Sequence, residues 1–124
     1  MRDIVSTEDA PSSPFFSQAV RGAGLIFVSG QAGHDPRTGQ LAGPTIEEQT
    51  RQSLTNIRAI LESAGSSMDK IVSATFILSK PEDFPGMNAE WKAWFPHDPP
   101  ARQGAKLPVD VSGLLVSIAD IAVE

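Results

Sequence analysis

The sequence predicts an α+β fold, a mixed β-sheet with two helices packed on one face. Two segments, 45–64 and 81–95, carry apolar residues at helical spacing. The remaining regular segments are short, rich in β-branched and apolar residues, and bounded by turn-forming residues, as strands are. In chain order they give strand, two strands, helix, strand, helix and two strands. This order favours helices that cover a single face of the sheet.

The N-terminal third is predicted to contain three strands joined by loops. The strands are expected at 4–5, 17–20 and 25–31. Segment 6–14 is rich in Ser and Pro, which indicates a loop. The connection 21–24 contains Gly22 and Gly24, which tolerate positive φ, so the second and third strands should form a hairpin. A polar loop is expected at 34–44.

The first helix has sequence signals at both ends. Thr45 and Glu48 have the spacing of a capping box, in which each side chain hydrogen-bonds a free backbone N–H group at the helix start. Gly65 stands where a left-handed C-cap is expected. Between them, apolar or small residues recur with a 3.6-residue period at 46, 50, 54, 57, 61 and 64. This period indicates one helix face turned towards a core.

The C-terminal half continues with a strand, a helix and two strands. A strand is predicted at 71–78, and the second helix should begin at Pro81 and end before Pro96. The last two strands are predicted at 101–107 and 114–123, and the final strand alternates, with Asp120 as the polar exception on an apolar face. Because the helices cover one sheet face, the other face and its apolar residues should contact a partner subunit.

Length and composition indicate one domain that spans residues 1–124, because domains commonly contain ~100–150 residues. The absence of cysteine excludes disulfides, thiolate metal ligands and a cysteine nucleophile. The net charge of −5 argues against nucleic-acid binding, which depends on clustered Lys and Arg. Neither a signal peptide nor an apolar stretch of membrane-spanning length is visible, so a cytoplasmic location with no membrane partner is expected.

Six stretches carry a resemblance to a known family. They are 14–20 (PFFSQAV), 27–31 (FVSGQ), 47–52 (EEQTRQ), 61–67 (LESAGSS), 87–88 (MN) and 100–102 (PAR). In this order and spacing they resemble the reactive-intermediate deaminase family (YjgF/UK114-like, also labelled endoribonuclease L-PSP) over nearly the whole chain. The resemblance implies a chorismate-mutase-like fold, a homotrimer around a barrel of sheets, and three sites between subunits. It also implies hydrolysis of imines or enamines of amino acids to 2-keto acids and ammonia, with no cofactor.

The resemblance assigns roles to four residues. Arg102 matches the arginine that binds the substrate carboxylate, a role suited to a planar and permanently charged guanidinium. The alternative is a surface or interface arginine in an ion pair. Ser29 and Gly30 match the turn that lines the pocket, and hairpin geometry is their alternative role. Asn88 matches a position beside the pocket, with helix packing or capping as the alternative.

Other positions depart from the family pattern. The glutamate proposed to position or activate the attacking water corresponds to Ala119, and a second frequent glutamate corresponds to Ser117. The usual tyrosine is Phe16, which would form a pocket wall without a hydroxyl group. Gln103 and Gly104 replace the polar or thiol residues that often follow the arginine. With Arg102 as the catalytic residue, the expected substrate-binding set is Phe16, Ser29, Gly30, Asn88, Gln103 and Ala119.

Three functional hypotheses follow. The leading one is a cofactor-free imine or enamine deaminase whose ligands are carboxylated imines, enamines or keto acids. The alternative is a trimeric small-carboxylate-binding protein without catalysis, because the glutamate position is Ala119. A ribonuclease or translation inhibitor is the third, and the acidic charge disfavours it. His34 and His97 lie in predicted loops without suitably spaced partners, which indicates solvated side chains and no metal site.

Overall fold

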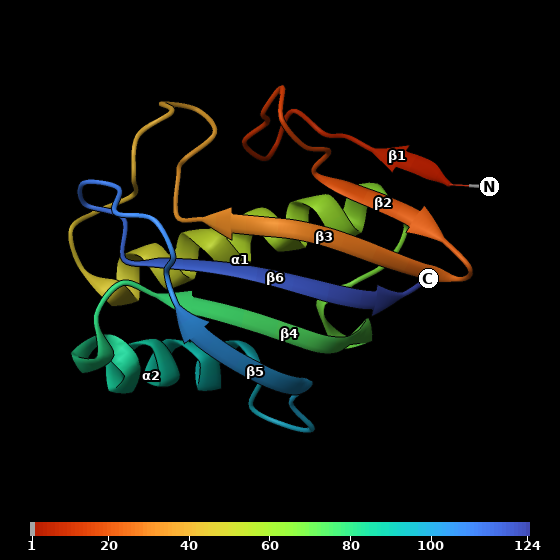
Figure 1. The fold of residues 1–124 in the computed structure, drawn as a ribbon. Helices are drawn as coiled ribbons and strands as arrows, with labels where there is room; N and C mark the ends of the chain where they lie inside the picture. Colours follow the sequence, from red (N-terminus) through yellow and green to blue (C-terminus); the bar gives the residue numbers. More distant parts are fainter. Residues whose placement is uncertain (1) are drawn as a thin grey trace.

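The computed structural model describes residues 2–124 and shows a six-stranded sheet with two helices on one face (Figure 1). The strands are β1 (Asp3–Val5), β2 (Ala19–Gly22), β3 (Leu25–Ala32), β4 (Ile71–Leu78), β5 (Ala101–Lys106) and β6 (Val116–Val123). The helices are α1 (Ile46–Ser63) and α2 (Phe84–Trp94). The spatial order of the strands is β1-β2-β3-β6-β4-β5, with β4 and β5 parallel and the remaining neighbours antiparallel. The predicted α+β fold class is confirmed.

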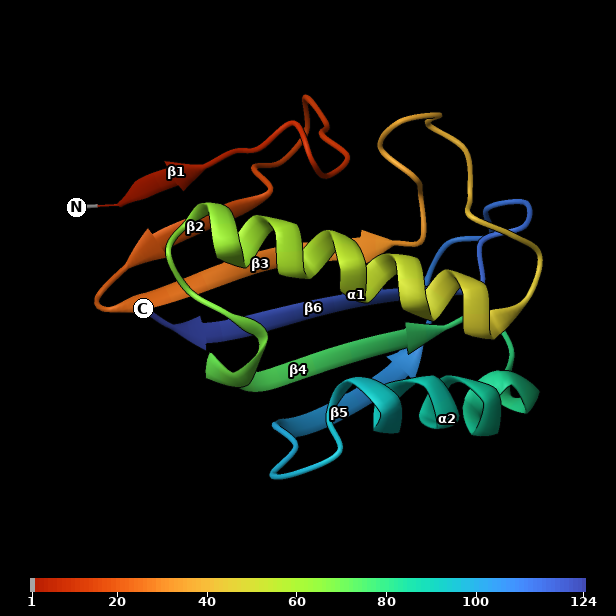
Figure 2. The same cartoon turned by 180° about the vertical axis from the view of Figure 1, so that it is seen from behind.

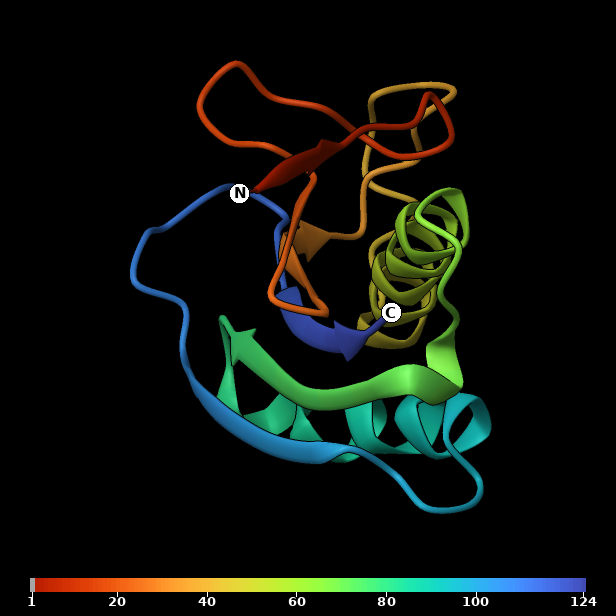
Figure 3. The same cartoon turned by 90° about the vertical axis from the view of Figure 1, so that its right-hand side faces the viewer.

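Both helices lie on the same side of the sheet (Figure 2), and the sheet curves around α1 when it is viewed end-on (Figure 3). The predicted capping box is present at the start of α1. Thr45 Oγ1 accepts a hydrogen bond from the Glu48 backbone N–H at 3.1 Å, and Glu48 Oε1 accepts one from the Thr45 backbone N–H at 3.3 Å. Gly65 follows the helix with φ +83°, as a left-handed C-cap requires. Local signals therefore define both ends of α1.

The second helix begins later than predicted. Residues Pro81–Asp83 form a short 3-10 helix, and the α-helix starts at Phe84. The reason is a second proline, Pro85, which has no N–H group to donate to the Pro81 carbonyl four residues earlier. The Phe84 N–H donates to that carbonyl instead, which is the bond of a 3-10 turn.

The predicted hairpin between β2 and β3 is confirmed, with a different turn. Gly22 is the last residue of β2, and the two turn residues with positive φ are Ala23 (55°) and Gly24 (78°). A two-residue turn of this kind matches the twist of the flanking strands. The turn therefore places a residue other than glycine, Ala23, in the left-handed conformation that glycine usually adopts.

The hydrophobic core fills the space between the sheet and the helices. It includes the fully buried residues Ile26, Leu54, Ile57, Ile60, Leu61, Met87 and Ile118. Strand β6 alternates as predicted, with Val116, Ile118, Asp120 and Ala122 buried. Asp120 is therefore a charged residue type placed among core side chains, with 3% of its surface exposed.

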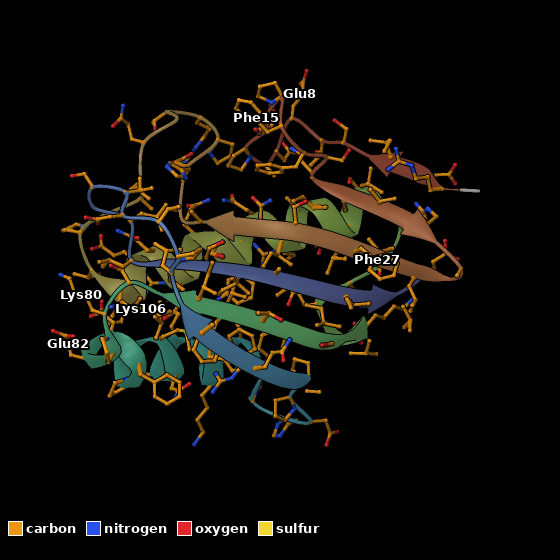
Figure 4. All side chains as sticks on the ribbon, viewed as in Figure 1. Glu8, Phe15, Phe27, Lys80, Glu82 and Lys106 are labelled. Atoms are coloured by element: carbon orange, nitrogen blue, oxygen red, sulfur yellow. The ribbon has the colours of Figure 1, made fainter. Side chains whose placement is uncertain are left out.

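No helix or loop of the described residues covers the middle of the opposite sheet face. Figure 4 shows Phe27 on this face, where 44% of its surface is exposed. The pairing register places Thr75 between Gln103 and Ala119, in one row across β5, β4 and β6. We refer to this surface as the open face.

Candidate active site

Arg102 lies near the start of the edge strand β5. Its partner in β4 is a core residue, so Arg102 shares the helix side of the sheet. The guanidinium Nη1 donates a hydrogen bond to Oδ1 of Asn88 on α2 at 2.8 Å. The guanidinium carbon lies 4.8 Å, 5.1 Å and 5.7 Å from the ring centroids of Phe76, Trp91 and Phe84, respectively. These cation–π contacts and the hydrogen bond fix the direction of the side chain.

Gly104 makes this arrangement possible. A Cβ atom at Gly104 would collide with Cζ of Phe76, so the ring of Phe76 occupies the space that a side chain would need. From there the ring stacks on Phe84, with centroids 5.6 Å apart. The departure from the family pattern at Gly104 therefore has a packing role beside Arg102.

The environment of Arg102 is suited to an anion. Within residues 2–124 it makes no ion pair, and the arginines that do are Arg21, Arg37 and Arg51. Partial burial lowers the pKa of Arg102, because desolvation disfavours the charged form, yet a guanidinium stays protonated at physiological pH. A cavity of about 320 Å³ adjoins it and is also lined by Asn88 and Lys92. A small carboxylate could occupy this position and accept the remaining guanidinium hydrogens.

A larger cavity of about 590 Å³ lies where β3 and β4 end and β6 begins. Phe16, Gly30 and Ser117 line it, so two of the expected pocket residues and the second glutamate position share one cavity. Most of its other lining is apolar and includes Pro11, Ile77, Leu107, Pro108, Val109 and Leu114. We call it the main cavity.

Ser29 and Gly30 lie at a shift in the β3–β6 register between Val28 and Gln31. The Ser29 hydroxyl donates to the Ser17 carbonyl at 2.6 Å, so its hydrogen bond serves the loop before β2. A Cβ atom at Gly30 would lie 2.9 Å from Oγ of Ser117. Glycine at this position therefore permits close contact between the two strands at the wall of the main cavity.

Buried polar residues of α1 hold the loops around the main cavity, and sequence reasoning missed them. Gln49 donates to the carbonyls of Gly43 and Gly113 at 2.9 Å and 2.8 Å and accepts from the Leu115 N–H at 2.9 Å. Two further residues of the same helix donate hydrogen bonds to backbone carbonyls at the end of β3 and in the loop that follows it. The Ser53 hydroxyl donates to the carbonyl of residue 31 at 2.5 Å, and the amide of residue 56 donates to the carbonyl of residue 34 at 2.9 Å. The signal was present, because residues 49, 53 and 56 are polar at the spacing of a buried helix stripe.

His34 is another residue that the structure reassigns. It lies in a loop, as predicted, and it is half-buried and lines the main cavity, whereas the sequence indicated only a solvated side chain. His97 is exposed, in agreement with that interpretation. Among residues 2–124 no group of three His, Asp or Glu side chains is arranged to hold a metal ion.

The expected site residues fall into separate groups within one chain. Arg102 and Asn88 lie on the helix side of the β5 edge, whereas Phe16 and Gly30 line the main cavity. Gln103 and Ala119 belong to the open face, because neighbouring residues of a strand point to opposite faces. Gln103 Nε2 donates to Thr75 Oγ1 at 3.2 Å there. A single chain therefore does not bring the guanidinium and the main cavity together.

Comparison with known proteins gives consistent results. The family model described as endoribonuclease L-PSP matches residues 7–124. The chain is 39% identical to a RutC family protein of Pyrococcus horikoshii over 98% of each chain. It is equally 39% identical to the 2-iminobutanoate/2-iminopropanoate deaminase of the goat, Capra hircus, over 100% of this chain and 91% of the relative.

Solved structures share the whole fold. A Rid family protein of Yersinia pestis, YyfA, superposes with a TM-score of 0.94 at 35% identity and full coverage of both chains. TdcF of E. coli with bound serine superposes with a TM-score of 0.90 at 28% identity, over 98% of each chain.

The part of the chain from residue 2 to residue 124 contains no helix that is both long and apolar enough to cross a membrane.

Proposed function

Because the chain belongs to the endoribonuclease L-PSP family, also called the reactive-intermediate deaminase family, we propose that it hydrolyses imines or enamines of amino acids to 2-keto acids and ammonia. The name of the goat relative supports this reaction class. The observation that carries the proposal is Arg102, a partly buried guanidinium without an ion-pair partner in residues 2–124. A substrate carboxylate would supply that partner.

In this proposal Arg102 binds the carboxylate and thereby positions the adjacent C=N carbon for attack by water. Asn88 and the surrounding rings hold the guanidinium before the substrate arrives, so little side-chain entropy is lost on binding. Orientation of this kind is itself a large part of catalysis. The bound serine of TdcF also carries a carboxylate, which supports a site for small carboxylates in this family.

The site is completed by a second copy of the chain in a homotrimer. Within one chain, Arg102 and the main cavity lie apart. In the trimer, Arg102 on the edge strand of one subunit would face the main cavity of the neighbouring subunit. The open face, with Phe27 exposed, offers the apolar surface for assembly. Sedimentation should give three times the mass of one chain, and a stable monomer would contradict the shared site.

The test of the reaction is hydrolysis of freshly generated 2-iminopropanoate and 2-iminobutanoate. The wild type should accelerate both, and Arg102→Ala should lose about 10²-fold in kcat/KM, since hydrogen bonds to a charged group contribute about 1.5–3 kcal/mol. Arg102→Lys keeps the charge without the fork and should fall between the two. Arg58→Ala is the matched control, because Arg58 also lies over a tryptophan ring, Trp94, at 5.1 Å. Equal loss in both alanine variants would contradict a specific role of Arg102.

A second candidate function is binding of small carboxylates without turnover. Ala119 and Ser117 favour it, because neither side chain can accept a proton from water near neutral pH. Calorimetry with pyruvate and 2-ketobutyrate would detect such binding, and the absence of hydrolysis by the same protein would establish it. Activity that appears only in Ala119→Glu would lead to the same conclusion.

Cleavage of RNA is the third candidate, and the net charge of −5 makes it the weakest. RNA cleavage that increases in specific activity with each purification step would support it. Loss of cleavage on purification would indicate a contaminating nuclease.

A further inference from the structure

Imine hydrolysis is faster when a side chain accepts a proton from the attacking water, and the family position for such a group is Ala119 in this chain. Asp120, the next residue, is buried on the helix side of the sheet, so its carboxyl group does not reach the main cavity. A side chain that accepts this proton would therefore have to come from another element. A titratable residue that lines the main cavity would meet this need.

Two residues of this kind line the main cavity, His34 and Asp35. Asp35 is engaged with Arg37, whose Nη2 and Nε donate to its carboxylate at 3.1 Å and 3.3 Å and whose backbone N–H donates at 2.9 Å. These bonds lower the pKa of Asp35, which makes its carboxylate a weak base. Imidazole, in contrast, can both accept and return a proton through its ring nitrogens.

We propose that His34 is the catalytic proton-transfer residue of this chain, an inference that rests on the proposed imine hydrolysis. Its position supports the role, because it lines the same cavity as Phe16, Gly30 and Ser117. The surrounding structure fixes its backbone. Asn56 Nδ2 donates to the His34 carbonyl at 2.9 Å, and His34 forms an antiparallel bridge with residue 41.

The residue before His34 adds to this rigidity. A Cβ atom at Gly33 would lie 2.5 Å from the Gln49 carbonyl oxygen, so the loop passes directly against the backbone of α1. A catalytic group needs such support, because small displacements weaken proton transfer. His34 thus combines a titratable side chain with a fixed backbone at the cavity wall.

The proton balance of the reaction can be written with His34 alone. Water attacks the carbon of the protonated imine, the C=N π pair moves to nitrogen, and His34 takes one water proton, which gives a neutral carbinolamine. The imidazolium then returns this proton to the amino nitrogen. The C–N bond breaks with its pair on nitrogen, the O–H pair forms C=O, and the hydroxyl proton passes to ammonia. The products are the 2-keto acid and ammonium, and His34 ends as it began.

Kinetics of His34→Gln and His34→Ala test this role, with His97→Gln as the matched control at the exposed histidine. We expect kcat to fall about 10²–10⁴-fold in both His34 variants with little change in KM, and His97→Gln to match the wild type. The pH profile of kcat/KM should differ between the wild type and His34→Gln, because the substitution removes the proton-transfer group. Added imidazole should restore part of the activity of His34→Ala.

Each outcome decides the role of His34. Wild-type kcat and an unchanged pH profile in His34→Gln, with activity still lost in Arg102→Ala, would overturn the inference and leave the proposed function standing. A lower kcat with an unchanged pH profile and no rescue by imidazole would show a merely structural role and would also overturn it. No hydrolysis by the wild type would overturn both proposals. Circular dichroism of each variant confirms that it is folded.

Discussion

Replacement of Asp120 by asparagine should remove a large pH dependence of stability. Asp120 lies in the middle of β6 between Val28 of β3 and Ala74 of β4, and its side chain faces the helices. Neither carboxylate oxygen has a hydrogen-bond partner among the described residues. Burial without a partner disfavours the charged form and raises the pKa of Asp120 from 3.8 to about 7. Asparagine has nearly the same shape and does not titrate in this range.

The sign of the effect follows from the two pKa values. Between about pH 4 and pH 7 the folded chain keeps the Asp120 proton, whereas the unfolded chain releases it. The unfolded state is therefore favoured increasingly as the pH rises through this range. Each pKa unit corresponds to about 1.36 kcal/mol. Between the two pKa values of Asp120, the free energy of unfolding therefore falls by about 4 kcal/mol because of this residue alone. Below about pH 4 the carboxyl group is protonated in both states and contributes no pH dependence.

Urea unfolding of the wild type and Asp120→Asn from pH 4 to pH 8 measures this contribution. The free energy of unfolding of the variant minus that of the wild type should increase by about 4 kcal/mol across the range, because all other titrating groups are common to both proteins. A single protein concentration is needed, since unfolding of an oligomer is coupled to dissociation. A difference that stays constant from pH 4 to pH 8 would refute the reasoning.

Three further substitutions, one of them with a matched control, test the packing, capping and buried hydrogen bonds described above. Gly104→Ala should lower the free energy of unfolding in urea by about 1–3 kcal/mol, because the new Cβ atom collides with Phe76. Gly22→Ala is the matched control. It should cause no loss in the same titration, because no heavy atom lies within 4 Å of the Cβ atom it adds. Thr45→Ala should cost about 1 kcal/mol through the lost cap, measured by thermal unfolding. Gln49→Leu leaves two carbonyls and one N–H group unpaired, so it should cost on the order of 3 kcal/mol and speed hydrogen exchange at the Leu115 amide.

Features of the fold with local causes could be predicted from the sequence. The capping box at Thr45, the C-cap at Gly65 and strand 71–78 depend on neighbouring residues, and the structure confirms them. The start of α2 was predicted three residues early, because the prediction considered Pro81 without the effect of Pro85 on its carbonyl. The prediction misplaced the hairpin turn, because Ala23 has a positive φ, which alanine seldom adopts.

The candidate site was less accessible to prediction. Resemblance pointed to Arg102 and Asn88, and the structure brings these two side chains into contact. The three rings around Arg102 come from β4 and α2, which no local pattern places beside β5. His34 was judged by its loop alone, although a loop can form the wall of a cavity. Its position depends on Asn56, which is 22 residues away in the sequence.

Strand β5 is an edge strand in the isolated chain. It pairs with β4 on one side only, and nearly every one of its residues is exposed. Exposed edges of this kind promote aggregation, and charged residues on them oppose it. The strand carries two, Arg102 and Lys106, and has no large apolar side chain. The residue assigned to carboxylate binding would therefore also protect newly made chains before they assemble. Arg102→Ala should accordingly give less soluble protein than Arg58→Ala, a loss of yield that is separate from any loss of activity.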